Sequence, residues 1–268
     1  MTFMIDVKDT ITYSFLRIFL KGVKSFLITI GNIGKDFVNV SKYILRLRIN
    51  LKATIEQSSR FAVDSLPITL TIVGMTSIII AMQIAPELAK QGAEGYIGML
   101  SAIVMVRELA CIMAGFAVIS MIGSSFASEL ASMAVGEQVS AMKVLKVDPI
   151  EYLVVPRFLA GVLMMPFIFI LSSFVGLLCA GIISKMTADL SLLNYVNSMW
   201  QGLVVKDIFI AMLKASFFGG TIALISCSWG YSTRGGAKEV GIATTQAVVW
   251  SFLAIAVWDY IFAVIFYL

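Results

Sequence analysis

The sequence predicts an all-α membrane protein, in which N-terminal interfacial amphipathic helices are followed by about five transmembrane helices. Two observations carry this prediction. The 268 residues are 59% hydrophobic and only 13% charged, with a mean hydropathy of +0.95, which excludes an ordinary soluble domain. Several apolar runs also reach the roughly 20 residues that a helix needs to cross a hydrocarbon core, and no alternating strand pattern accompanies them.

Residues 1–60 are predicted to form the N-terminal interfacial amphipathic helices. In two successive stretches, apolar residues recur on one helical face and basic residues lie opposite them. The apolar positions are Phe15, Phe19, Val23, Phe26 and Ile30, then Phe37, Val40, Ile44, Leu47 and Leu51. Basic amphipathic helices of this kind lie against anionic headgroups at the membrane surface. The basic charge therefore already has a partner in the membrane, and no nucleic-acid partner is expected.

Residues 61–268 are predicted to form one transmembrane domain. Its spans are expected at residues 65–85, 97–126, 158–183, 208–229 and 248–268. Residues 185–207, which include Trp200, are expected to be a polar loop. Two rows of small residues at four-residue spacing are expected to let helix backbones approach closely. The rows are Gly123, Ala127 and Ala131, and Ser124, Ser128 and Ser132.

The distribution of Lys and Arg predicts the orientation in the membrane. Fifteen of the 20 lie in residues 1–60, 129–157 and 231–242, which fall on one side if the chain has five spans. Three lie on the other side and two lie inside spans. Because basic residues stay on the cytoplasmic side, we expect a cytoplasmic N-terminus and a C-terminus outside, in the periplasm for a bacterium.

A short helix is predicted between the second and third spans, in the cytoplasm. It includes residues 137–145 and ends before Pro149, which disfavours helical geometry at Asp148. Val139, Met142 and Leu145 are expected to share one face, with polar residues on another. The spacing leaves two interpretations open: the helix docks into a partner, or it lies on lipid headgroups.

Four charged residues fall inside the predicted spans: Arg107, Glu108, Lys214 and Asp259. Charges inside a membrane are costly unless they are paired or hydrated, so they mark candidate functional sites. Lys214 is the natural partner for Glu108 or for a phosphate. The pattern fits either a buried structural ion pair or the polar floor of a cavity that accepts an amphiphile's headgroup, and Asp259 is interpreted as structural.

No residue pattern indicates catalysis. The chain has no His, and Cys111, Cys179 and Cys227 sit in apolar segments as small buried residues. Gly230 and Gly235 have the first spacing of a P-loop, but Gly236 and Ala237 stand where Lys and Ser or Thr are required. We therefore expect no enzyme activity, no metal site and no cofactor, with any ATP bound by a partner.

Several short motifs together resemble the MlaE/YrbE family of ABC transporter permeases, which work with MCE proteins. The motifs are Arg107-Glu108-Leu109, Glu129-Leu130-Ala131-Ser132-Met133, Glu137-Gln138, Val147-Asp148-Pro149, Pro156-Arg157-Phe158, Gly230-Tyr231 and Gly241-Ile242-Ala243-Thr244-Thr245-Gln246-Ala247-Val248-Val249. The resemblance extends from about residue 65 to the C-terminus. Ala110 and Cys111 replace a Gly-Pro pair common in relatives, so we expect a straighter second helix.

The resemblance implies a homodimer of permeases that moves phospholipid or another hydrophobic molecule between the membrane and an MCE-domain assembly. Two cytoplasmic ATPases would supply the energy, and the helix between the second and third spans would be a coupling helix docked in an ATPase groove. The implied coupling residues are Glu137, Gln138, Met142, Leu145, Asp148 and Pro149, and the implied lipid-pocket residues are Arg107, Glu108 and Lys214. The implied location is a bacterial inner membrane or the plastid inner envelope.

Two other classes of function are consistent with the same residues. An ion-coupled secondary transporter of an amphiphilic solute would use Glu108 as a proton or ion site, although the chain has no repeated half. A structural scaffold of a membrane complex would use the intramembrane charges only for pairing. Co-purification of an ATPase with lipid-stimulated turnover distinguishes all three.

Overall fold

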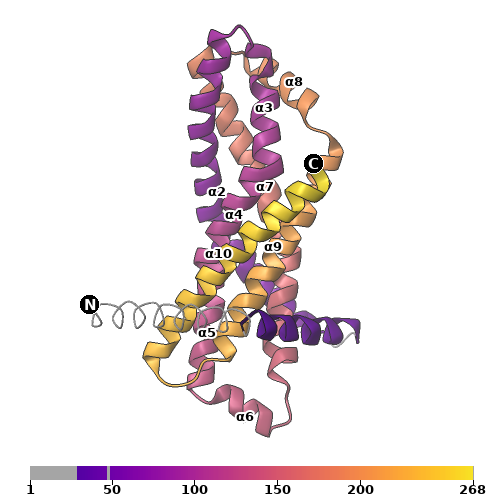
Figure 1. Ribbon diagram of the computed structural model, residues 1–268, viewed down its shortest axis with the longest axis vertical. Helices are drawn as coiled ribbons and strands as arrows, with labels where there is room; N and C mark the ends of the chain where they lie inside the picture. The colour runs from indigo at the N-terminus through magenta and orange to yellow at the C-terminus, as the bar shows by residue number, and fades with distance from the viewer. Residues whose placement is uncertain (1–28, 47–48, 268) are drawn as a thin grey trace, which may run out of the picture.

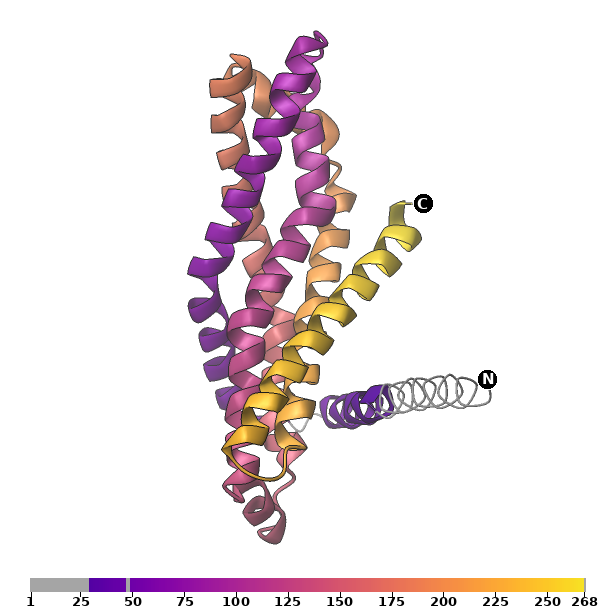
Figure 2. The same ribbon diagram turned by 60° about the vertical axis from the view of Figure 1, so that its left-hand side comes forward.

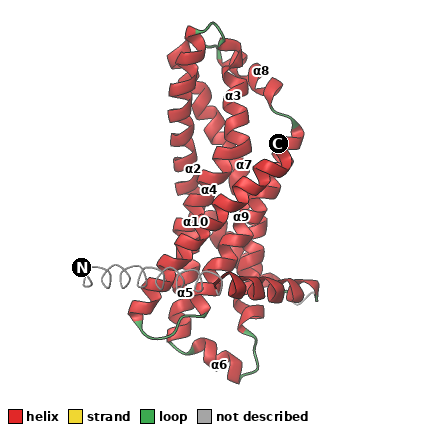
Figure 3. Cartoon of the chain, in the orientation of Figure 1, coloured by secondary structure: helices red, strands yellow, loops and turns green. Residues whose placement is uncertain are grey.

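The computed structural model describes residues 29–46 and 49–267 and is built around five long helical segments (Figure 1). They are α2 (Leu51–Lys90), the composite segment Glu94–Val135, the segment Ile150–Ala188 that contains α7 (Val155–Ala188), α9 (Val205–Tyr231) and α10 (Ala237–Tyr267). Each is long and apolar enough to cross a membrane. The predicted all-α membrane fold with five spans is confirmed, and the described part of the chain contains no strand (Figure 3).

The N-terminal part of the prediction is only partly covered by the structure. Residues 1–28 lie outside the described residues, and residues 29–45 form one helix that lies across the bundle, called here the crosswise helix (Figures 1 and 2). The boundary predicted at residue 60 falls inside α2, which begins at Leu51. Asn50 caps this helix by accepting a hydrogen bond from the Ala53 amide at 3.2 Å.

The second long segment is continuous but not a regular α-helix. It comprises η1 (Glu94–Tyr96), α3 (Ile97–Val104), η2 (Met105–Leu109), α4 (Ala110–Val118), η3 (Ile119–Gly123) and α5 (Ser124–Val135). Both η2 and η3 are wide π-helical turns, which shift the side chains that follow them around the helix axis. A straighter second helix was expected because Ala110 and Cys111 replace a Gly-Pro pair, but the segment carries a π bulge at the charged pair although η2 contains no glycine or proline.

Glycines allow the closest helix contacts in the bundle. A Cβ atom on Gly161 of α7 would lie 2.4 Å from the carbonyl oxygen of Gly219 in α9. A Cβ atom on Gly230 of α9 would lie 2.8 Å from the carbonyl oxygen of Ala127 in α5. The predicted packing row that contains Ala127 is therefore confirmed. The serine row is not buried against another helix, because Ser132 is exposed and the Ser124 hydroxyl bonds back to the Ser120 carbonyl at 2.5 Å.

The predicted polar loop at residues 185–207 is wrong, because α8 (Leu192–Gly202) forms a helix there. It packs so closely on α3 that a Cβ atom on Gly98 would lie 2.2 Å from the Tyr195 carbonyl oxygen. Burial raises the pKa of the Tyr195 hydroxyl to about 12, so this group stays neutral. With α8 in place, one end of the bundle is covered by the α2–α3 turn and α8 (Figure 1).

The opposite end of the bundle carries the segment between the second and third spans. It holds α6 (Gln138–Val144), which projects beyond the other helices, followed by the π turn η4 (Ile150–Val154) at the start of α7 (Figure 1). The α9–α10 loop and the crosswise helix lie toward the same end. The described parts of the three basic regions, residues 29–46 with 49–60, 129–157 and 231–242, therefore lie toward one end of the molecule, as five spans require.

Candidate functional site

A cluster of charged side chains lies inside the bundle where η2 meets α9 and α10. The Lys214 ammonium is 2.6 Å from a Glu108 carboxylate oxygen and also contacts the Asp259 carboxylate. The Arg107 guanidinium is 2.9 Å from an Asp207 carboxylate oxygen. The predicted pairing of Glu108 with Lys214 is confirmed, and Asp259 shares the same ammonium. Three separate spans are joined at this point by charge.

The π turn η2 helps to place these groups. A π turn leaves carbonyl groups out of the regular helical ladder, and in a membrane such groups need another donor. The Lys214 ammonium donates to the Arg107 carbonyl oxygen at 3.2 Å, in addition to its contacts with the two carboxylates. The bulge and the lysine therefore support each other: η2 offers the carbonyl, and α9 supplies the cation that satisfies it.

Burial divides the cluster into enclosed and accessible groups. The Lys214 side chain is fully buried and the Asp207 side chain is 7% exposed, whereas Arg107 and Glu108 are 31% and 34% exposed. Lys214 is therefore enclosed by its carboxylate partners, and Arg107 and Glu108 form the accessible surface. The Arg107 guanidinium also lies 4.8 Å from the centre of the Tyr267 ring, a cation–π contact with the end of α10.

The charge balance of the cluster is acidic. Two cations, Arg107 and Lys214, face three carboxylates, those of Glu108, Asp207 and Asp259. Sequence reasoning missed Asp207 because it lies at the end of the stretch that was expected to be a loop. No sequence signal marked this residue: in the structure α9 begins at Val205, two residues earlier, and carries Asp207 into the span and toward η2.

The segment between the second and third spans presents apolar residues to the outside. Val144 and Leu145 are 82% and 75% exposed, and Val147 is 40% exposed. Val139 is buried and Met142 half-buried against the bundle, whereas Leu145 is exposed, so the expected apolar face is only partly covered by the rest of this chain. Large apolar side chains this exposed at a helix end are typical of a protein or membrane contact.

The remaining predicted residues of this segment shape its backbone. Glu137 and Lys146 adopt left-handed conformations, with φ of 58° and 59°, at the two ends of α6. Glu137 and Gln138 are exposed, and Pro149 is buried where the chain re-enters the bundle. The Asp148 carboxylate accepts a hydrogen bond from the Ile150 amide at 2.9 Å, which caps η4.

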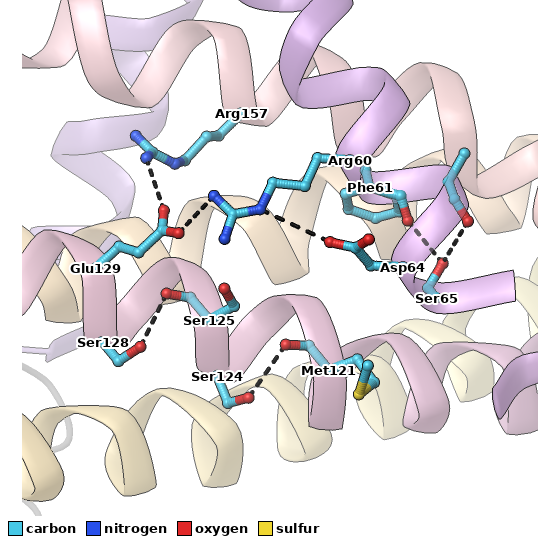
Figure 4. Close-up of polar contacts among 11 residues, drawn as sticks. Arg60, Phe61, Asp64, Ser65, Met121, Ser124, Ser125, Ser128, Glu129 and Arg157 are labelled. Carbon is cyan, nitrogen blue, oxygen red and sulfur yellow. Dashed lines mark hydrogen bonds and ion pairs between the residues drawn. The ribbon is translucent and has the colours of Figure 1, made fainter. Parts of the chain in front are cut away.

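An ion-pair clamp closes the base of this segment (Figure 4). The Glu129 carboxylate of α5 is 2.5 Å from the Arg60 guanidinium of α2 and 3.1 Å from the Arg157 guanidinium of α7. Arg157 is buried, donates to the Leu153 carbonyl oxygen at 2.9 Å and lies over the Phe126 ring. Because Glu129 and Arg157 flank α6 in the chain, the clamp ties both ends of the segment together and to the first span.

Comparison with known proteins identifies the family. A model of the MlaE permease family matches residues 54–265, which is most of the chain. The chain belongs to the MlaE permease family. It is 39% identical over 213 residues to a probable ABC transporter permease protein of Synechocystis, covering 80% of this chain and 81% of that protein. A probable ABC transporter permease protein of Rickettsia prowazekii is 32% identical over 232 residues, covering 87% of this chain and 89% of the relative.

A plant protein is also similar to this chain. Protein TRIGALACTOSYLDIACYLGLYCEROL 1, chloroplastic, of Arabidopsis thaliana is 35% identical over 224 residues, covering 84% of this chain and 64% of the relative. The matched regions include η2, the clamp residues and the whole α5–α7 segment. As an MlaE family member the chain is a multi-pass ABC transporter permease, and the charged cluster and the α5–α7 segment are its candidate functional sites.

Proposed function

We propose that this permease moves phospholipids or similar hydrophobic molecules between the membrane and an MCE-protein assembly, driven by partner ATPases. Two copies of the chain form the permease, and each receives one ATPase subunit. The observation that carries the proposal is the pair of exposed apolar residues, Val144 and Leu145, on a helix that projects from a membrane-spanning bundle. ABC transporter permeases need such a contact surface for the ATPase, and the chain itself carries no complete P-loop.

The mechanism is a mechanical coupling between the ATPases and the spans. ATP binding draws the two ATPases together and moves the α6 helices docked on them. Because the Glu129 clamp joins α5, α7 and α2 beneath α6, the displacement reaches three spans as one rigid unit. The cavity between the two permease copies then changes shape and releases or admits a lipid.

The charged cluster supplies the polar part of the lipid pocket. Arg107 is accessible and meets the headgroup phosphate, while Glu108 lies beside it as an acceptor for headgroup donors. Lys214 holds Glu108 in place from behind, since its own ammonium is enclosed by carboxylates. Acyl chains pack against apolar side chains of the spans.

The proposed location is the cytoplasmic membrane of a bacterium or the inner envelope of a plastid. The name of the Arabidopsis relative, which contains a galactolipid and the word chloroplastic, supports both the lipid cargo and the plastid alternative. The N-terminus and α6 face the cytoplasm, and the C-terminus faces the other side, where the MCE assembly sits. The position of the described basic residues toward the α6 end supports this orientation.

The test is co-purification of the permease with its ATPase. Leu145→Asp places a charge in the proposed contact and should remove the ATPase from the complex on size exclusion. Leu193→Asp is the matched control, because Leu193 is 69% exposed on α8 at the opposite end of the bundle. An unchanged complex in Leu145→Asp contradicts the proposal. Lipid uptake driven by an ion gradient without any ATPase supports the secondary-transporter alternative instead.

A further inference from the structure

The crosswise helix contacts the bundle at points that the transport mechanism described so far does not use. Its Tyr43 hydroxyl donates a hydrogen bond to the Asp148 carboxylate, 105 residues away in the chain. Its Phe37 ring packs edge-on against the Phe158 ring at 6.4 Å between centroids. One contact is on Asp148, in the turn between α6 and η4 (residues 145–149, called here the hinge), and the other is on the first turns of α7. The crosswise helix therefore contacts the same segment that the clamp closes.

A second attachment fixes the crosswise helix to α9. The Asp36 carboxylate accepts hydrogen bonds from the Ser228 hydroxyl at 2.6 Å and the Tyr231 hydroxyl at 2.7 Å. Asp36 is 5% exposed, and a buried carboxylate with two hydroxyl donors resists displacement. The crosswise helix is therefore held on α9 at one point and reaches Asp148 from there.

Asp148 is the residue at which these connections meet the α6 segment. One of its carboxylate oxygens caps η4 through the Ile150 amide at 2.9 Å, and the other accepts the Tyr43 hydroxyl. The residue thus sets the angle at which the chain leaves α6 and enters α7. A lost hydroxyl at Tyr43 leaves the cap intact but releases the hinge from the crosswise helix.

We propose that Tyr43 and Asp36 are positioning residues that make the crosswise helix a brace for the α6 segment. The brace sets the resting position of the hinge at Asp148 relative to α9, so that movement of α6 is transmitted to the spans and is not lost in the hinge. The effect on transport rests on the proposed ATPase coupling, whereas the effect on the hinge is a property of this chain alone.

Hydrogen exchange of the full-length permease in lipid nanodiscs tests the brace without any ATPase. Tyr43→Phe should speed amide exchange in residues 138–150 by about tenfold or more, because one hydrogen bond to a charged group is lost. Tyr152→Phe is the matched control: this tyrosine lies in the same segment and is 53% exposed. It should leave exchange unchanged. Equal exchange in Tyr43→Phe and the parent, or an equal rise in Tyr152→Phe, overturns the proposal.

A second variant separates the brace from a local effect at Asp148. Asp36→Asn weakens the attachment to α9 far from the hinge in sequence, and it should speed exchange both in the crosswise helix and in residues 138–150. A rise confined to the crosswise helix contradicts the brace. In the assembled transporter, Tyr43→Phe should retain the ATPase and lower the lipid moved per ATP, whereas loss of ATPase from Leu145→Asp reports on the proposed function alone.

Discussion

Replacement of the buried Lys214 by Met is the strongest perturbation of the charged cluster. Met has a similar length and is apolar, so Lys214→Met keeps the packing of a fully buried side chain while removing its charge. Glu108 and Asp259 then lose the ammonium that they share, and the Arg107 carbonyl loses its extra donor. The change therefore measures the electrostatic contribution of the lysine with little contribution from packing.

The size of the effect follows from the burial of the pair. Removing one partner of a buried ion pair costs about 3–5 kcal/mol, because the other charge is left without compensation. At about 2–4 °C per kcal/mol for a chain of this size, the melting temperature should fall on the order of 10 °C. Lys185→Met, at an exposed site near the end of α7, should change it by no more than about 2 °C.

Thermal unfolding of the purified permease in one detergent is the assay, with a compensated variant as the internal check. The triple change Lys214→Met, Glu108→Gln and Asp259→Asn removes all three charges, and it should recover most of the stability because neutral replacements of buried ion pairs are often tolerated. The account of the cluster is refuted if Lys214→Met and Lys185→Met have the same melting temperature, or if the triple variant is less stable than Lys214→Met.

Three further changes test the proposed lipid pocket, the ion-pair clamp and the helix packing. Glu108→Gln should lower lipid transfer several-fold while the complex still assembles. Glu94→Gln, at an exposed site, should leave lipid transfer unchanged. Equal transfer by the two variants would show that Glu108 is not part of the lipid pocket. Glu129→Gln weakens the ion pairs with Arg60 and Arg157 and should lower the unfolding free energy by about 2 kcal/mol, measured by thermal unfolding. Glu87→Gln, the control in an exposed ion pair, should lower it by at most about 0.5 kcal/mol. Gly219→Ala puts a Cβ atom 2.1 Å from the Gly161 carbonyl oxygen and should lower the unfolding free energy by about 1–3 kcal/mol. Gly241→Ala, where nothing lies within 4 Å of the added Cβ atom, should be neutral or stabilising. An equal loss of stability at both sites would contradict the close α7–α9 contact.

The spans were predictable because membrane helices must satisfy their own backbone and remain apolar for about 20 residues. The same constraint made the Glu108–Lys214 pair predictable, since few charges in the spans were available to pair. Helix ends were less predictable. The helix α9 begins before the apolar run from which its span was predicted, so it includes Asp207, although the composition of residues 185–207 suggested a loop.

Contacts between segments that are distant in the chain could not be predicted from the sequence. Three-residue spacing groups Val139, Met142 and Leu145 on one side, but it does not say how far that side extends beyond the neighbouring helices. Glu129 belongs to a family-like motif, yet its two arginine partners depend on how α2 and α7 approach α5. For α8, a short apolar repeat within a polar stretch was too weak to separate a helix from a loop.

Reconstituted lipid transfer tests the central claim that this permease takes its energy from a separate ATPase through the α6 segment. Vesicles containing the permease alone, the permease with its ATPase, and Leu145→Asp with the same ATPase are compared with and without ATP. Transfer is expected only for the parent pair with ATP. Equal transfer by the permease alone, or ATP-driven transfer that persists in Leu145→Asp, contradicts the account.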